Sequence, residues 1–259
     1  MLILNETIPA MINSVDSTLK YRGKDIIGDS IFFDLEHYLY KEPIAIGVFG
    51  AAVYHKDEKA IKTTQYMIEN KKDARVILNM TREYFTEMKK IGKKYLVTFS
   101  GNNDFLVVNH LFRKYEIDYD FNEEFELVDI QKEYETKFRK NIGLKNLEKL
   151  HHIERDGELI SGMTLAKTFS KIIKDRGYIE RMPADKITRI LKYNEQDVVN
   201  LFNIMNQWEE VTIDDVMVLE EKLLKEKLEK LEMKRLLQEE LDKNSENHVQ
   251  MDDFAGELG

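Results

Sequence analysis

Asp34 and Glu36 stand one residue apart within the apolar segment 31–36. Side chains of a β-strand repeat every two residues, so both acids point to the same face of the strand that this segment predicts. Two like charges beside apolar side chains repel each other and lose hydration, and a hard divalent cation such as Mg²⁺ relieves both costs. The pair therefore indicates a metal site. The alternative is a strand end whose acids are simply solvated at a loop.

Tyr193 and Asp197 form a second pair of chemically capable side chains, on a helix predicted over residues 185–208. Asp185 is the expected N-cap, and apolar residues recur behind it at the spacing of a buried stripe. The i and i+4 spacing places the tyrosine and the carboxylate one above the other at the edge of that stripe. Taken alone, such a pair is typically a boundary aspartate beside a tyrosine whose hydroxyl reaches water. It gains weight only from the first pair of acids.

The elements that must hold these acids alternate between strands and helices. Continuous apolar runs predict β segments, and amphipathic stretches that stop at Gly92 or Gly177 predict helices. A strand, a turn and a helix follow one another between residues 95 and 115, which is the order of an α/β layer. The expected β segments are 31–35, 43–54 and 95–99, and the expected helices are 73–90, 104–115, 164–176 and 185–208.

The C-terminal part differs in composition from the rest. Residues 216–241 consist almost entirely of Glu, Lys, Leu and Met and predict a charged amphipathic helix. Their leucines keep no strict heptad, so self-association, a protein partner and packing against the main domain all stay open. We expect four regions: an N-terminal segment over 1–27, an α/β domain over 28–209, the charged helix over 214–242, and a disordered acidic tail over 243–259.

The composition of the chain excludes several classes of protein. Its 259 residues include 42% apolar residues and no cysteine, which allows a core but neither a disulfide nor a thiolate metal site. Residues 1–10 lack a signal-peptide pattern, and the most apolar stretch, 43–54, falls short of the roughly 18 residues that suggest a membrane span. We therefore expect a cytoplasmic protein without a membrane partner.

The charge balance bears on the substrate. A formal charge of −9 counts against a nonspecific nucleic-acid coat protein, which is normally basic. It does not exclude an enzyme that acts on phosphodiesters, because such a site needs acids to hold metal. Local basic runs at 89–94 and 113–114 could meet a phosphate backbone, or they could be solvated helix ends.

Five strings of the sequence, taken in order, carry a resemblance to a known family. They are Phe32-Phe33-Asp34-Leu35-Glu36, Thr98-Phe99-Ser100-Gly101-Asn102-Asn103-Asp104, Gly143-Leu144-Lys145-Asn146-Leu147-Glu148, Ser161-Gly162 and Tyr193-Asn194-Glu195-Gln196-Asp197-Val198. The set resembles the ribonuclease H-like, YprB-type branch of the DEDD exonuclease superfamily, over roughly residues 28–207. The ordered set is far more specific than any one of its members.

The resemblance implies a fold, an activity and a site. It implies a mixed β-sheet flanked by helices, and a 3′–5′ exonuclease that acts on the 3′ ends of single-stranded DNA or RNA. It implies two divalent ions, Mg²⁺ or Mn²⁺, held by carboxylates, and it places a tyrosine where the tyrosine subclass orients the attacking water. The residues that match are Asp34, Glu36, Asp104 and Asp197 for the metals, and Tyr193 for the water.

The second motif departs from the pattern of the family. The family has Phe-Asp at the end of this motif, whereas Asp104 precedes Phe105 here. A slip of one residue on a helix rotates a side chain by about 100°, so either a gap restores Asp104 or the metal acid is displaced. Asp129 is a second candidate acid, with a plain strand end as its alternative. A binding module for nucleic acid or protein, impaired in catalysis by this change, is therefore the rival function.

Overall fold

The computed structural model describes residues 1–157 and 159–256, with the side chains of all of these except 102, 237 and 239–256. The chain divides into two compact units, Met1–Val211 and Thr212–Gly259. All the residues that the sequence predicts for the site lie in the first unit.

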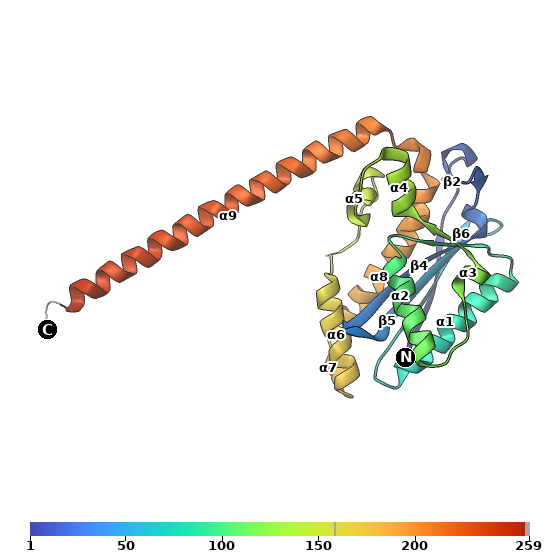
Figure 1. Ribbon diagram of the computed structural model, residues 1–259, viewed down its shortest axis with the longest axis horizontal. Helices are drawn as coiled ribbons and strands as arrows, with labels where there is room; N and C mark the ends of the chain where they lie inside the picture. The colour runs from blue at the N-terminus through green and yellow to red at the C-terminus, as the bar shows by residue number, and fades with distance from the viewer. Residues whose placement is uncertain (158, 257–259) are drawn as a thin grey trace. The chain divides into compact units, whose positions relative to one another are not determined.

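A mixed six-stranded sheet lies at the centre of the first unit (Figure 1). The strands, in their order across the sheet, are β1 (Leu2–Pro9), β6 (Ala60–Met67), β5 (Glu42–His55), β4 (Ser30–Tyr40), β7 (Tyr95–Thr98) and β8 (Glu126–Asp129). The first four pair antiparallel, whereas β4 with β7 and β7 with β8 pair parallel. A separate small ladder joins β2 (Lys20–Tyr21) to β3 (Lys24–Asp25). The predicted α/β class with a mixed sheet is confirmed.

Helices flank the sheet on both faces. The helices of the first unit are α1 (Asp73–Lys90), α2 (Asn102–Lys114), α3 (Phe121–Glu124), α4 (Ile130–Phe138), α5 (Leu144–Leu150), α6 (Gly162–Lys174), α7 (Tyr178–Arg181) and α8 (Ala184–Asn206), with short 3₁₀ turns at Val15–Ser17, Ile27–Asp29 and Trp208–Glu210. Phe33 on β4 packs against Phe85 of α1, with ring centroids 5.3 Å apart. The next side chain back, Phe32, packs against Phe202 of α8 at 5.8 Å. Because strand side chains alternate, α1 and α8 cover opposite faces.

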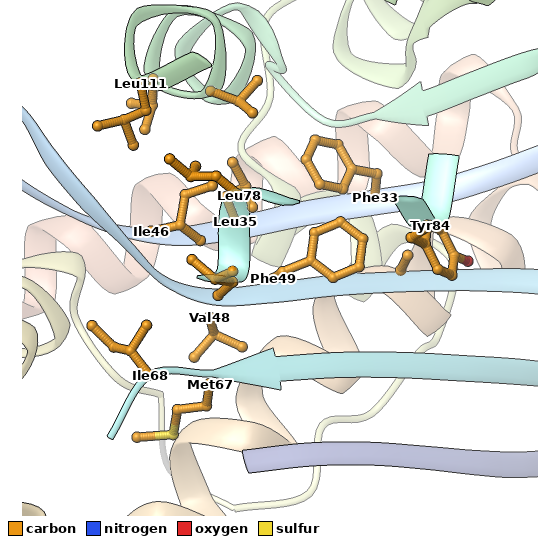
Figure 2. Packing of buried hydrophobic residues seen from close by; sticks show 14 of the residues in the cluster. Phe33, Leu35, Ile46, Val48, Phe49, Met67, Ile68, Leu78, Tyr84 and Leu111 are labelled. Carbon is orange, nitrogen blue, oxygen red and sulfur yellow. The ribbon is translucent and has the colours of Figure 1, made fainter. Parts of the chain in front are cut away.

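The main hydrophobic core joins the sheet to α1, α2, α6 and α8, and Figure 2 shows part of it. Phe33 and Phe49, from neighbouring strands, lie side by side there, and Tyr84 of α1 meets Phe49 with ring centroids 5.2 Å apart. This packing fixes β4 and β5 against the helix layer. It therefore holds rigidly the strand that carries Asp34 and Glu36.

The strand β4 extends well past its neighbour β7. Its pairing with β7 ends at Phe32, whereas its pairing with β5 continues to Tyr40. Over residues 33–40, β4 therefore has a strand partner on one side only among the described strands. The register with β5 shifts between Glu36 and His37 and again between Tyr38 and Leu39, as at β-bulges, which re-aim side chains.

The sequence predicted the helices of this unit better than its strands. The helix 73–90 begins and ends as predicted, while β4 and β5 are longer than expected. Neither β1 nor β6 was predicted. The segment 1–27, which the sequence sets apart, contributes β1 to the sheet through its pairing with β6.

The second unit contains one long helix, α9 (Ile213–Gly256). The sequence predicted a helix over 214–242, and α9 continues beyond that end into the region that it predicted to be disordered. Residues 257–259 of that predicted tail lie outside the described residues. Leucines 224, 228, 231 and 236 each expose more than half of their surface. Within the described chain, no helix combines the length and the apolar character that a membrane crossing requires.

Candidate active site and metal centre

Three carboxylates from two elements converge beside the sheet. Asp34 and Glu36 come from β4, and Asp197 comes from α8. One oxygen of each lies within 4.8 Å of the others. The helix is held over the strand by Phe202, which packs on Phe32. The strand and the helix that the sequence predicts for these acids thus bring them together.

A buried hydrogen-bond chain orients Asp34. The Asn194 amide donates to Asp34 Oδ2 at 3.1 Å, and the Gln65 amide donates to Asn194 Oδ1 at 2.8 Å. Gln65 also donates to the Leu191 carbonyl at 2.9 Å, so its own position is fixed. Gly50 leaves space for the Asn194 side chain, because a Cβ at position 50 would lie 2.1 Å from Asn194 Oδ1. The glycine is therefore required by the close approach of the asparagine.

Two cations meet Asp197 on the other side of the cluster. Lys145 Nζ lies 2.6 Å from Asp197 Oδ1, and Arg155 pairs with the same oxygen. Arg155 is itself held by Glu148, whose Oε2 accepts from its Nε at 2.7 Å. The Asn200 amide donates to Glu148 at 3.0 Å. Arg155 exposes only 9% of its side chain, compared with 29% for Lys145, so the arginine is the fixed cation and the lysine the accessible one.

The same two cations lie over the ring of Tyr193. Lys145 Nζ is 4.5 Å from the ring centroid and Arg155 Cζ is 5.4 Å from it. Burial raises the pKa of the tyrosine hydroxyl, and the negative charge of Asp197 raises it further. The hydroxyl therefore stays protonated at neutral pH and remains a hydrogen-bond donor beside the acids.

The carboxylates carry more negative charge than their protein partners neutralise. Burial and the charge of Asp197 raise the pKa of Asp34 to about 7. Burial, together with the neighbouring carboxylates, also raises the pKa of Glu36 and that of Asp104 well above their ordinary values. Neither of these two side chains accepts a hydrogen bond from any other described residue. A donor set of hard oxygens with unneutralised charge fits a divalent cation such as Mg²⁺ or Mn²⁺.

Asp104 lies on the same side as the cluster but is not one of the three converging carboxylates. It occupies the first turn of α2 and exposes 8% of its surface, and its pKa is raised by burial and then by the charges of Asp34 and Asp197. Asp129 has another task. Its Oδ1 accepts from the backbone N–H of Ser100 at 2.9 Å and of Gln131 at 3.0 Å, so it caps α4 and holds the turn before α2. The geometry therefore favours Asp104 over Asp129 as the fourth acid.

Several residues of the site received no role from the sequence. Lys145, Glu148 and Asn194 lie within the strings that carry the family resemblance, and that membership was the available signal. No motif in the sequence pointed to Arg155 or Gln65, because their contacts are made with elements far away along the chain. These residues orient and neutralise the carboxylates, which is a property of the folded chain alone.

Comparison with known families fixes the class of the protein. A family model of the RNase_H superfamily matches residues 31–209, which include all the acids described above. The chain belongs to this superfamily, and the superfamily indicates a nuclease. The match defines no finer branch, so the assignment to the YprB type and the tyrosine subclass stays a prediction. No curated protein and no solved structure matches the chain.

Proposed function

We propose that the protein is a metal-dependent 3′–5′ exonuclease that hydrolyses single-stranded DNA or RNA with two divalent ions. The observation that carries the proposal is the convergence of Asp34, Glu36 and Asp197 within 4.8 Å, in a chain of the RNase_H superfamily. Phosphodiester hydrolysis needs carboxylates to hold metal rather than a nucleophilic serine or cysteine. The excess of negative charge in this cluster meets that need.

The four acids would hold the ions in distinct ways. Asp34, oriented by Asn194, has an oxygen within 4.8 Å of oxygens of both Glu36 and Asp197, so these three acids would hold an ion together. Asp104, outside the group of three, would contribute more weakly. When bound, divalent ions neutralise the acids, activate water and stabilise the charge that develops on the leaving oxygen.

Tyr193 would position the attacking water. Its hydroxyl is a protonated donor beside the acids, and Lys145 and Arg155 both lie over its ring. Contacts with two cations restrict the orientation of the ring, so its hydroxyl can hold a water molecule in one place. Lys145 is exposed enough to contact the substrate phosphate once Asp197 is shared with an ion.

Cleavage of end-labelled oligonucleotides tests the activity and its direction. With Mg²⁺ or Mn²⁺, a 5′-labelled single strand should shorten by one nucleotide at a time, whereas a 3′-labelled strand should release a labelled mononucleotide first. Parallel DNA and RNA strands identify the substrate. Asp34→Asn and Asp197→Asn should abolish shortening, and the matched control Asp118→Asn, at an exposed acid, should not. Shortening that survives in the first two variants would refute the proposal.

Calorimetry with Mn²⁺ separates the enzyme from its rival. The proposed nuclease should bind two ions, and Asp197→Asn should weaken this binding. One ion or none, together with intact oligonucleotides, would instead identify a binding module on the same fold. The two outcomes need no knowledge of the natural substrate.

A further inference from the structure

A basic pocket of about 570 Å³ opens where three helices of the first unit begin or end. Its cationic lining comes from the start of α1 and the end of α6, and the ring of Tyr115, directly after α2, completes the wall. The cations are Lys71, Lys72, Arg75, Lys174 and Arg176, and all five are exposed. We call this group the basic pocket.

The cations of the basic pocket lack acidic partners. No carboxylate lines the pocket, and none of the five cations forms an ion pair with another described residue. Lys174 lies over the ring of Tyr38, 5.8 Å from its centroid. A group of unneutralised cations repels itself, so it costs stability unless an anion binds. In a chain with a formal charge of −9, a general excess of lysine cannot explain the group.

The lysine run at 89–94 behaves differently, although it is denser along the sequence. Lys89, Lys90 and Lys94 pair with Glu124, Glu87 and Asp29, at 3.7, 2.6 and 2.9 Å. These cations are neutralised within the protein. The basic pocket is therefore distinguished by its missing counter-charges rather than by its number of cations.

Two elements connect the basic pocket to the acids. Tyr38, which contacts Lys174, lies two residues after Glu36 along β4, a distance of about 7 Å. Tyr115 follows α2, whose first turn carries Asp104, and the 11 steps along the helix from Asp104 to Tyr115 span about 16 Å. Between the two places, β4 has no partner on the side of β7 among the described strands.

We propose that the basic pocket binds the phosphate backbone of the substrate strand, upstream of the nucleotide that is removed. This inference rests on the proposed function, which places the 3′ end of the strand at the acids. A separation of about 16 Å corresponds to about 5 stacked nucleotides at about 3.4 Å each. The cations supply contacts that do not depend on sequence, and the ring of Tyr115 offers a face on which a base can stack.

Binding measured without cleavage tests the basic pocket separately from catalysis. Fluorescence anisotropy with Mg²⁺, on strands whose 3′-terminal linkage is a cleavage-resistant phosphorothioate, would compare labelled single strands of about 3 and about 15 nucleotides, because only the longer one spans the gap estimated at about 3.4 Å per nucleotide. In Lys71→Gln/Lys72→Gln/Arg176→Gln, affinity for the longer strand should fall about 10- to 100-fold. The salt slope of log K should also fall by about 2, since each lost contact removes about 0.7. The shorter strand should bind as it does to the unaltered protein.

Two matched variants complete the design. Lys89→Gln/Lys90→Gln/Lys94→Gln changes the net charge equally at neutralised lysines and should leave both affinities within about twofold. Lys71→Arg/Lys72→Arg/Arg176→Lys keeps the charge and should restore binding of the longer strand. Thermal unfolding checks that each variant is folded.

The outcomes decide the inference clearly. Equal losses on both strands, no loss on the longer strand, or equal losses in the control variant would overturn it. Competition by inorganic phosphate beyond that of chloride at equal ionic strength would assign the pocket to a free anion, and would overturn it too. If no strand is ever cleaved but binding depends on length as expected, the proposed function fails and the pocket remains a nucleic-acid site.

Discussion

Like charges gather at two places in the first unit, and the two places differ in burial. The acids at Asp34, Glu36 and Asp197 are partly or wholly buried and lie within 4.8 Å of one another. The cations of the basic pocket are exposed. Burial makes repulsion strong, so the acids need an ion or protons to remain together. Exposure makes repulsion weak because water and salt screen it, so the cations can remain together and act on affinity without a fixed geometry.

Some other charged side chains of the first unit differ from these two groups because they have partners within the protein. Lys94, for example, is neutralised by Asp29. Lys93 is buried, and its ammonium donates to the carbonyls of Gly28 and Tyr54 at 2.7 and 3.1 Å. A group of like charges without partners, rather than a single unpaired charge, therefore points to a ligand. The kind of ligand depends on the burial of the group: the buried acids need an ion or protons, whereas the exposed cations can bind a hydrated anion.

Removing one acid should give the largest effect. Asp34→Asn should lower the rate of cleavage about 1,000-fold or more, because it removes a metal-holding charge while keeping the shape of the side chain. The thermal midpoint without metal should not fall, since the change also removes a buried like charge. Single-turnover cleavage and thermal unfolding measure the two quantities. A rate within about tenfold of the unaltered protein would remove the acids from the chemistry.

Breaking the buried ion pair should have the next largest effect, and on stability rather than on rate alone. Arg155→Met leaves Glu148, which is 2% exposed, without its cation. Breaking such a pair costs about 3–5 kcal/mol of unfolding free energy. Lys145→Met, at the more exposed cation on Asp197, is the matched control and should cost about 1 kcal/mol or less. Chemical denaturation measures both, and equal costs would contradict the assignment of fixed and accessible cations.

Disturbing the orientation of Asp34 should have a smaller effect. Asn194→Leu removes the donor to Asp34 and the acceptor of the Gln65 amide. Loss of such a partner typically lowers metal affinity about 10- to 100-fold. Gly50→Ala should act in the same direction, because its Cβ would displace Asn194. Mn²⁺ calorimetry measures the affinity of the protein for the ion. Unchanged binding in both variants would show that the hydrogen bonds of Asn194 have no part in holding the ion.

The convergence of Asp34, Glu36 and Asp197 was predictable because it depends in part on local periodicity. Alternation along β4 and the i, i+4 spacing on α8 set the direction of Asp34 and Asp197, and the order of the strings supplied the rest. The partners of these acids depend on tertiary contacts between distant elements, so Arg155 and Gln65 were missed. The strand β1 was missed because it exposes most of its side chains and its apolar run ends at Leu4.

The basic pocket could not be predicted from the sequence either, because it also depends on tertiary contacts. Its cations come from 71–75 and 174–176, two short groups about 100 residues apart that the fold brings to one place. The contiguous run at 89–94 is the densest of the basic segments named from the sequence. In the folded protein, however, its lysines pair with carboxylates or donate to backbone carbonyls. Density of charge along the chain is therefore a poor guide to charge that is free to bind. Only the folded arrangement shows which cations lack a partner.

The pH dependence of the thermal midpoint should also distinguish the buried acids from the exposed cations, and we expect this effect to be the smallest. The folded pKa of Asp34 is raised to about 7 from an ordinary value of 3.8, so the folded protein holds this proton where the unfolded chain has lost it. The stabilisation from Asp34 is therefore present below about pH 4 and is lost as the pH rises through about 7. In EDTA, the thermal midpoint of the unaltered protein relative to Asp34→Asn should fall between pH 5 and pH 7.5. Neutralising the exposed Lys72 with Lys72→Gln should leave this difference unchanged, and an equal response there would mean that burial does not separate the two places.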